Sequence, residues 1–362
     1  MNAAVFLPNW VGDAVMATPT LRAFRDALGP DARIVGIMRP HLIELLQGTD
    51  WLTESWAFDP RSNDRALRIG TVTRRMRDAN FDIGLMLSNS LRCAWMCYRA
   101  GVRRRIGYAG NCRTMFLTDR LYWTRTGCGM LPGIGGNRAA IPNVDQYLRL
   151  LEPLGCVCPS RKLELQTSRA DRQEAEKVWS ELNLNADGRV IALSGGGAYG
   201  PSKLWPEKNL AELAKMIVER LDHDVLVLCG PKEKDSARRV VQAADSKRVV
   251  SMADQRLVWG NVKACIERCR MMVATDSGPR HIGAALGLPV VTLFGPTVTT
   301  WIENPTVRGT HLMNESLDCL GCYKRECPLG HHRCMTELKP QTVFEAVAAT
   351  LDSDSTANQE MH

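Results

Sequence analysis

The chain has 362 residues, 45% of them hydrophobic and 23% charged, with 13 cysteines and a formal net charge of +7. Its length suits about two domains that each bury a core, and its composition excludes a wholly disordered chain. No apolar run reaches the roughly 18 residues of a membrane-spanning helix, and the N-terminus lacks the features of a signal peptide, so we expect a cytoplasmic protein with mostly reduced thiols.

In the first half of the chain, short apolar runs alternate with segments of helical period. The runs predict strands over 3–7, 33–38 and 83–87, and the periodic segments predict helices over 12–28, 40–46, 64–80, 91–98 and 144–154. Residues 127–142 are rich in Gly and Pro and are predicted as a long loop.

The second half repeats this alternation. The predicted strands are 190–193, 225–229, 249–251, 271–274 and 290–294, and the predicted helices are 170–182, 206–221, 233–244, 262–270 and 280–286. Strands that alternate with helices form parallel sheets covered on both faces, because parallel pairing needs crossover connections. We therefore predict an α/β fold of two Rossmann-like, doubly wound domains, residues 1–160 and 161–351, with a ligand in the cleft between them. Residues 352–362 have no pattern and are predicted as a disordered tail.

The net positive charge of the chain comes entirely from its first half. Residues 1–155 hold 20 Arg, no Lys and 13 Asp or Glu, whereas the remainder has 26 basic and 26 acidic residues. A basic surface there would suit nucleic acid, an anionic lipid surface or a phosphorylated substrate, and the alternative is a solvated arginine-rich surface without a partner.

The first candidate motif is the segment 9–19, which follows the first strand and opens the first helix. Gly12 lets the backbone approach a ligand, and Asp13 lies in the first turn of the helix. A carboxylate there could accept a proton from a substrate hydroxyl. The alternative is an aspartate that only complements the helix dipole.

The second motif is the glycine-rich loop 194–200, which is followed by Lys203. Its glycines formally match the dinucleotide fingerprint, but Pro201 and Pro206 delay the helix and the next strand does not end in an acid. An NAD site, and with it an oxidoreductase, is therefore not expected. A glycine loop that carries a lysine just before a helix still suits a phosphate group.

The third motif runs off the end of a strand into a helix, over residues 275–285. The free amides at Ser277 and Gly278 could bind a diphosphate. Asp276 could bind sugar hydroxyls, and His281 follows one turn later. The alternative is an ordinary capped helix with a core histidine.

The fourth motif contains Cys319, Cys322, Cys327 and Cys334. Four thiols this close could form a tetrahedral zinc site, although the long loop usual between two cysteine pairs is missing. An iron–sulfur site, disulfides and free buried thiols stay open as alternatives. The other nine cysteines are expected to be small core residues.

Together the motifs resemble glycosyltransferase family 9, the heptosyltransferases of lipopolysaccharide core synthesis, over nearly the whole chain. The segments that carry the likeness, in the family's order, are WVGDAVMATPTLRAFR at 10–25, RRRIGY at 103–108, NVDQYLRLLEPLG at 143–155, GGGAYGPSKLWP at 195–206 and DSGPRHIGAALGLPVVTLFGPT at 276–297. The first of these and YKRECPLGHHRCM at 323–335 look most like the heptosyltransferase II branch.

The resemblance implies the GT-B architecture, with two Rossmann-like domains facing across a cleft and the nucleotide sugar held mainly by the C-terminal one. It implies that Asp13 is the catalytic base of an inverting transfer and that Gly12 lies beside the donor. Lys203 would neutralise the donor diphosphate, and Glu233 would bind the ribose.

The same resemblance gives the third motif its role. Asp276, Ser277 and Gly278 would hold the diphosphate and the heptose hydroxyls, with His281 after them. Arg280 departs from the apolar residue common in the family at that position.

We therefore expect transfer of heptose from ADP-heptose to the lipopolysaccharide inner core, by a monomer peripheral to the cytoplasmic face of the inner membrane. No cofactor is expected for the chemistry, and the possible zinc would be structural. One alternative is a family 9 transferase with another nucleotide sugar or acceptor. The other is a basic nucleic-acid-binding protein, which the absence of a recognisable binding motif disfavours, so no nucleic-acid partner is expected.

Overall fold

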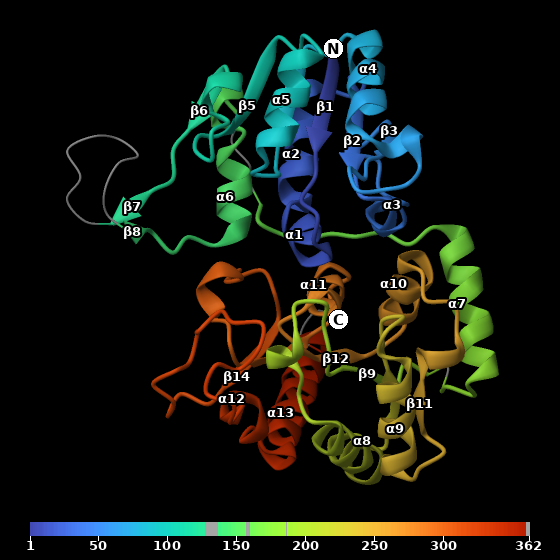
Figure 1. Ribbon diagram of the computed structural model, residues 1–362. Coiled ribbons are helices and arrows are strands. Elements are labelled where there is room, and N and C mark those ends of the chain that lie inside the picture. Colours follow the sequence, from blue (N-terminus) through green and yellow to red (C-terminus); the bar gives the residue numbers. More distant parts are fainter. Residues whose placement is uncertain (127–136, 157–159, 186, 360–362) are drawn as a thin grey trace. The chain divides into compact units, whose positions relative to one another are not determined.

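The computed structural model describes residues 1–126, 137–156, 160–185 and 187–359 (Figure 1). The chain forms two compact units, Met1–Leu163 with Thr300–Asn304, and Glu164–Thr299 with Pro305–His362. The first division lies close to the boundary predicted after residue 160. The return of Thr300–Asn304 to the first unit was not predicted, and there Asn304 Nδ2 donates a hydrogen bond to Arg161 O at 2.9 Å.

The first unit contains a six-stranded parallel sheet of order β3-β2-β1-β4-β5-β6. Its strands are β1 (Asn2–Phe6), β2 (Arg33–Met38), β3 (Glu54–Ala57), β4 (Ile83–Met86), β5 (Arg104–Tyr108) and β6 (Asp119–Leu121). Its helices are α1 (Val11–Met16), α2 (Thr18–Leu28), α3 (Pro40–Leu46), α4 (Ile69–Ala79), α5 (Leu91–Arg99) and α6 (Asn143–Arg149). A separate antiparallel pair joins β7 (Arg125–Thr126) and β8 (Asn137–Arg138).

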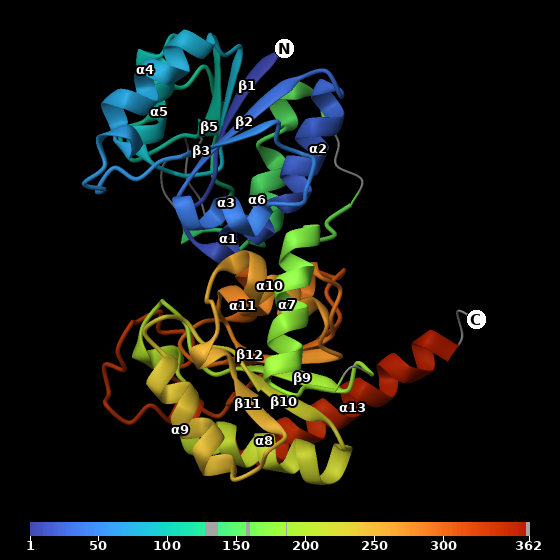
Figure 2. The same cartoon turned by 90° about the vertical axis from the view of Figure 1, so that its right-hand side faces the viewer.

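Helices cover both faces of this sheet. In Figure 2, α4 and α5 lie on one side of the strands, and α2 and α6 on the other. The central strands β1, β2 and β4 are almost entirely buried and read as continuous apolar runs, as expected of strands covered on both faces.

The second unit repeats the same plan, with a parallel sheet of order β11-β10-β9-β12-β13-β14. Its strands are β9 (Val190–Ser194), β10 (Asp224–Val227), β11 (Val249–Ser251), β12 (Met271–Thr275), β13 (Val290–Phe294) and β14 (Gly309–Met313). Its helices are α7 (Arg169–Glu181), α8 (Glu207–Leu221), α9 (Lys234–Ala244), α10 (Trp259–Glu267), α11 (Gly278–Ala285), α12 (Arg333–Thr336) and α13 (Pro340–Gln359). Helix α8 packs on α9 and α13, and α10 packs on α7 and α11.

Both sheets have the strand order of the Rossmann fold. In each, the order reverses beside the first strand, between β1 and β4 and between β9 and β12. Ligands of open parallel sheets bind outside the carboxyl ends of the strands at this reversal. The segments that follow β1, β9 and β12 are the first three motifs of the sequence, so the fold brings these three to ligand-binding edges.

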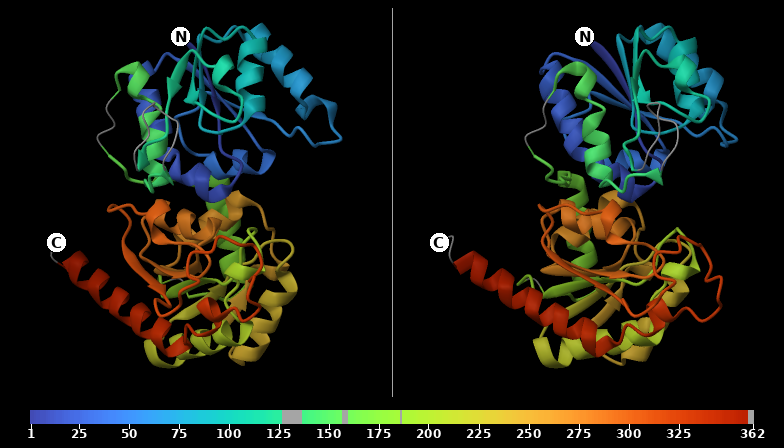
Figure 3. Two further views of the ribbon diagram at one scale, coloured as in Figure 1. Left: turned by 60° about the vertical axis from the view of Figure 1, so that its left-hand side comes forward. Right: turned by 90° about the vertical axis from the view of Figure 1, so that its left-hand side faces the viewer.

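Two of the differences between the predicted elements and the structure have a clear physical reason. The helix predicted over 12–28 is divided into α1 and α2, because Pro19 in the first turn of α2 has no amide hydrogen to continue the ladder. The tail predicted from residue 352 continues α13 to Gln359 as one helix (Figure 3), since the segment contains neither Gly nor Pro to end it. In the described part of the chain, no helix is both long and apolar enough to cross a membrane.

Candidate donor and acceptor sites at the two strand reversals

In the second unit, the loops after β9 and β12 touch one another. Thr275 Oγ1 at the end of β12 donates a hydrogen bond to Gly196 O at 3.1 Å. A Cβ on Gly197 would lie 2.9 Å from Ser277 Cβ, closer than real carbon atoms approach. The glycines of this loop are therefore required for close packing of two motifs that lie about 80 residues apart.

Lys203 and Asp276 form a buried ion pair at this edge. The Lys203 ammonium donates to Asp276 Oδ2 and to Asp276 O, both at 2.6 Å, and each side chain is 11% exposed. Thr297 Oγ1 donates to the same carboxylate oxygen at 2.7 Å. Burial alone would raise the pKa of Asp276, but the Lys203 charge and these hydrogen bonds outweigh it and the pKa is lowered. Asp276 is therefore a carboxylate at neutral pH.

The Lys203 ammonium has further contacts that fix its position. Two of its three protons are directed at Asp276, which leaves the third for a ligand oxygen. The ring of Tyr199 lies 4.9 Å from Nζ, within the range of a cation–π contact. Lys203 is thus a positive charge fixed in place before any ligand arrives.

His281 is buried on α11 and is held by Arg280. Arg280 Nη1 lies 3.2 Å from His281 Nδ1, while Nε donates to Thr292 Oγ1 at 3.2 Å and Nη2 lies 3.3 Å from His311 Nε2. Arginine can only donate, so Nδ1 of His281 must accept and its proton must be on Nε2. Burial, reinforced by the Arg280 charge, lowers the pKa of His281 to about 3, so the ring is a neutral donor at pH 7.

Replacing Arg280 by methionine should release this constraint. Because the Arg280 charge lowers the pKa of His281, Arg280→Met should raise it, and the ring should lose its fixed preference for a proton on Nε2. Nitrogen-15 NMR of histidine-labelled protein measures both changes, with His223 on another element as an internal control. An unchanged tautomer and pKa in the variant would contradict this arrangement.

Glu233, expected at the ribose, lies at the N-terminus of α9. Its Oε2 accepts a hydrogen bond from Gly230 N at 2.7 Å. A Cβ on Gly196 would collide with Glu233 Oε1. Glu233 therefore borders the same glycine loop as Ser277, and the structure brings it together with Lys203 and Asp276 at one edge of the second sheet.

Asp13 and Gly12 belong to the first unit. They lie in the first turn of α1, directly after β1 and at the β1/β4 reversal, and both are partly buried. The aspartate is thus placed at the ligand-binding edge of its own sheet.

The segment that carries the cysteine motif packs on the Lys203 loop. Tyr199 Oη donates to Tyr323 O at 2.6 Å, and Ser202 donates through N to Arg325 O at 3.1 Å and through Oγ to Lys324 O at 2.6 Å. His332 Nε2 lies 2.7 Å from Ser202 O. Residues 323–332 therefore hold the 3₁₀ helix η4 (Pro201–Lys203), and with it the lysine, in place.

Gly200 is the point where these segments approach most closely. A Cβ there would lie 2.5 Å from Arg325 O, a backbone atom that cannot move alone. Gly200→Ala should therefore lower the free energy of unfolding by about 1–3 kcal/mol through overpacking and weaken nucleotide binding by shifting Lys203. Urea unfolding and calorimetry measure the two effects, and wild-type values for both would show that the contact is not required.

The structure does not confirm the predicted zinc site. In the described residues, which include all of 319–334, no three His, Cys, Asp or Glu side chains are grouped to hold a metal ion. Cys334 is instead a core residue, and burial, with smaller contributions from the other three thiols, raises its pKa to about 11. Cys327 Sγ accepts the amide of His332 at 3.4 Å, which lowers its pKa.

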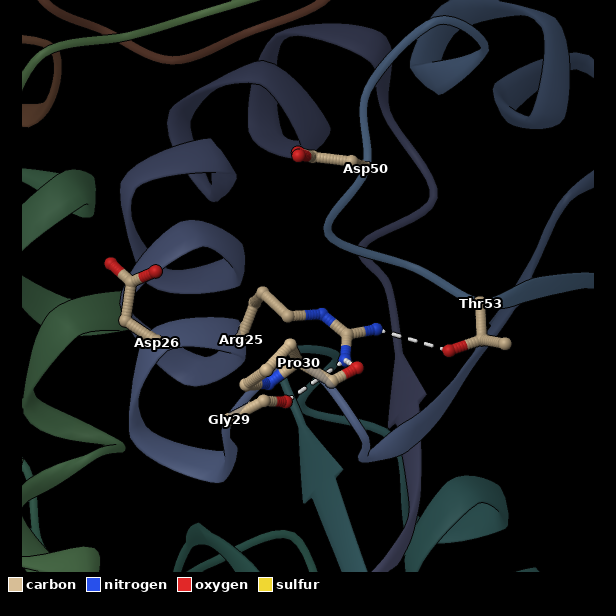
Figure 4. Close-up of a pocket in the computed structure, with 6 residues that line it drawn as sticks. All are labelled: Arg25, Asp26, Gly29, Pro30, Asp50 and Thr53. Carbon is tan, nitrogen blue, oxygen red and sulfur yellow. Dashed lines mark hydrogen bonds between the residues drawn. The ribbon is translucent and has the colours of Figure 1, made fainter.

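One surface hollow, of about 560 Å³, lies away from every predicted site residue (Figure 4). Its centre is Arg25, which donates to Thr53 Oγ1 at 3.0 Å and to Gly29 O at 3.3 Å. These bonds tie the end of α2 to the segment before β3. Asp26 and Asp50 at the rim point away from Arg25 (Figure 4). Arg25, at the centre of the hollow, therefore has a structural role.

Comparison with known proteins decides the family. The sequence pattern of glycosyltransferase family 9 (heptosyltransferase) matches residues 69–333. The chain belongs to glycosyltransferase family 9. Lipopolysaccharide heptosyltransferase 2 of Escherichia coli K12 is 24% identical over 97% of this chain and 99% of its own length. Lipooligosaccharide heptosyltransferase 2 of Haemophilus influenzae is 23% identical over 95% and 98%.

Solved structures of the family have the same fold. A family 9 glycosyltransferase from Veillonella parvula matches with a TM-score of 0.80 and 21% identity over 97% of both chains. The E. coli ADP-heptose lipopolysaccharide heptosyltransferase II matches with a TM-score of 0.75 and 22% identity over 98% of this chain and 100% of that one. The predicted α/β, GT-B class and the prediction of a glycosyltransferase are confirmed for this family 9 chain.

Proposed function

We propose that this family 9 enzyme transfers heptose from ADP-heptose to the inner core of lipopolysaccharide, with inversion at the anomeric carbon. The observation that carries the proposal is the buried Lys203–Asp276 pair at the β9/β12 reversal. The relatives named above, which align over nearly their full length, support ADP-heptose as the donor and the lipopolysaccharide core as the acceptor.

Binding of the donor and departure of ADP are supported by the charges at the edge of the second sheet. When the bond from the anomeric carbon to the diphosphate breaks, negative charge develops on the leaving ADP. Lys203 and the amides of Ser277 and Gly278 at the start of α11 are preorganised donors for that charge. Asp276 would accept hydroxyl hydrogens of the heptose through the oxygen that Lys203 and Thr297 do not occupy, and Glu233 would bind the ribose.

Activation of the acceptor hydroxyl is assigned in this proposal to Asp13. In the proposed step, an Asp13 carboxylate oxygen takes the proton of the acceptor hydroxyl as that oxygen attacks the anomeric carbon, and ADP leaves from the opposite face. Gly12, next to it, has no side chain to obstruct the approach of the donor. No cofactor takes part in this chemistry, because the protein's own cations and amides compensate the leaving group.

The location follows from the acceptor. The lipopolysaccharide core is built on a lipid, so we propose that the enzyme works as a monomer at the cytoplasmic face of the inner membrane. The predicted structural zinc is tested separately by metal analysis of protein purified without chelator.

Turnover with a panel of nucleotide sugars tests the proposal. With a heptose-deficient core acceptor, ADP-heptose should give product of inverted configuration, and ADP-glucose or UDP-sugars should give much less. A clear preference for another nucleotide sugar or acceptor would assign the chain to a sibling activity within family 9.

A further inference from the structure

The excess of arginine gathers on one surface of the first unit. Helices α4 and α5, with the 3₁₀ helices η1 (Arg65–Leu67) and η2 (Thr114–Phe116) next to them, form what we call the α4–α5 face. Its exposed arginines are Arg65, Arg68, Arg74, Arg75, Arg77, Arg92 and Arg99. The exposed acids among these elements and their flanking residues are Asp64 and Asp78. The charge asymmetry of the sequence is thus concentrated on a single face.

The same face exposes large apolar side chains. Leu91, Trp95 and Tyr98 follow one another at helical spacing on the outer side of α5 and are 43%, 38% and 52% exposed. Met115 of η2 is 71% exposed. Four of the ten large hydrophobic residues exposed in the described chain therefore come from α5 and η2.

The inner side chains of these helices pack in the hydrophobic core of the first unit. Cys93, Met96 and Cys97 of α5 and Met76 of α4 are buried against the first sheet. Burial against the sheet therefore accounts for the inner side of these helices, whereas the outer side chains remain largely exposed.

The outer side chains are held in a fixed arrangement. Arg77 Nη2 donates to Arg99 O at 3.1 Å, which links α4 to the end of α5. The ring of Tyr98 packs on Phe116, with centroids 5.4 Å apart, and the Arg105 guanidinium lies 5.8 Å from the Tyr98 ring. Charge and apolar area are thus interleaved on a rigid platform.

We propose that the α4–α5 face binds the surface of an anionic lipid bilayer. Aromatic side chains settle at the level of lipid headgroups, and arginines beside them attract anionic lipids. Leu91 and Met115 favour lipid over nucleic acid, because aliphatic side chains gain from insertion between lipids and gain little at a phosphate backbone. The purpose of such binding, which is to keep the enzyme at its lipid-linked acceptor, rests on the proposed function. The observations that support the binding do not depend on it.

Vesicle cosedimentation of the full-length protein tests the face without any substrate. The wild type should bind vesicles that contain phosphatidylglycerol, bind pure phosphatidylcholine vesicles weakly, and lose binding as salt is raised. Arg74→Gln/Arg92→Gln/Arg99→Gln should weaken binding to the anionic vesicles by at least about tenfold. Trp95→Ser/Tyr98→Ser should also weaken it, while leaving some salt-sensitive binding.

Matched controls remove similar groups from the other unit. Arg169→Gln/Lys208→Gln/Lys215→Gln removes three exposed charges, and Leu329→Ser removes an exposed apolar side chain, so both should bind like the wild type. Equal loss in these controls, or no loss in the face variants, would overturn the proposal. So would binding of the wild type to duplex DNA as tight as to anionic vesicles.

Calorimetry with ADP on the same variants separates this proposal from the proposed function. Normal ADP affinity with lost vesicle binding supports the face independently of the chemistry. Vesicle binding that persists in the face variants overturns the face and leaves the transferase assignment untouched, whereas a wild type that binds vesicles but not ADP contradicts the donor site alone.

Discussion

Asp13→Asn is expected to keep the fold and the affinity for ADP and to lose at least about a hundredfold in turnover, the lower range for removal of a general base. The amide has the shape of the carboxylate but cannot accept the acceptor proton. Because the Lys203–Asp276 pair lies in the other unit, donor affinity should not change. Single-turnover kinetics with saturating ADP-heptose measures the chemical step directly.

A second aspartate of the first unit gives the matched control. Asp26 is exposed on α2, at the rim of the hollow in Figure 4. Asp26→Asn makes the same chemical change away from the strand reversal, so its turnover should stay near that of the wild type. Near-normal turnover of Asp13→Asn would show that Asp13 is not the base. A large loss of turnover in Asp26→Asn would indicate that the hollow contributes to turnover.

Lys203→Met is expected to weaken ADP binding by about ten- to a hundredfold, the value of one charge-assisted hydrogen bond of about 1.5–3 kcal/mol. It should also destabilise the protein by about 3–5 kcal/mol, because the buried Asp276 carboxylate loses its counter-ion. Calorimetry with ADP measures the first effect, well below the melting temperature of the variant, and urea unfolding measures the second.

The two effects are separated by a second buried lysine. Lys263 on α10 is 0% exposed, and its ammonium lies 3.6 Å from Asp171 on α7 in the same unit. Lys263→Met should lose stability for the same reason and bind ADP like the wild type. Unchanged ADP affinity in Lys203→Met would take this lysine out of the donor site, and an equal loss in Lys263→Met would attribute the effect to stability alone.

Most of the central strands could be predicted from sequence because they are buried on both faces. The exception is β5, which begins with two partly buried arginines and was not predicted. The strand at 33–38, the strand at 290–294 and the helix at 40–46 were predicted with the bounds that β2, β13 and α3 have. A strand covered on both sides must be apolar throughout, and that pattern is visible without any knowledge of its partners.

Three of the four edge strands were not predicted. The fourth, β11, was predicted at 249–251, the bounds that it has in the structure. β3, β6 and β14 lie at the edges of their sheets and include polar or exposed residues. In β14, residues 309–311 are exposed. What makes such a segment a strand is the neighbour it pairs with, and that information is not local.

The candidate site was predicted as separate motifs, and their assembly was not. Lys203 and Asp276 were each singled out, but nothing in the sequence showed that they pair, or that Thr297 donates to the same carboxylate. Arg280 was noted only as a departure from the family. Its contact with His311 depends on β14, a strand that was itself missed.

The cysteine motif has a structural role that its spacing did not predict. The spacing predicted a metal, whereas the backbone oxygens of Tyr323, Lys324 and Arg325 hold the loop that carries Lys203. Because backbone atoms make these contacts, the types of the residues involved do not reveal them.

The return of Thr300–Asn304 to the first unit affects how the enzyme can be divided. Ile302 is 7% exposed and Asn304 9%, and both are counted with the first unit although the second unit precedes and follows them in sequence. A fragment cut after residue 163 would separate these two residues from the unit to which they belong, so separate expression of the halves should give a less soluble C-terminal fragment. Deleting the loop, or replacing its apolar residue, would be the first step in designing a C-terminal half that stands alone.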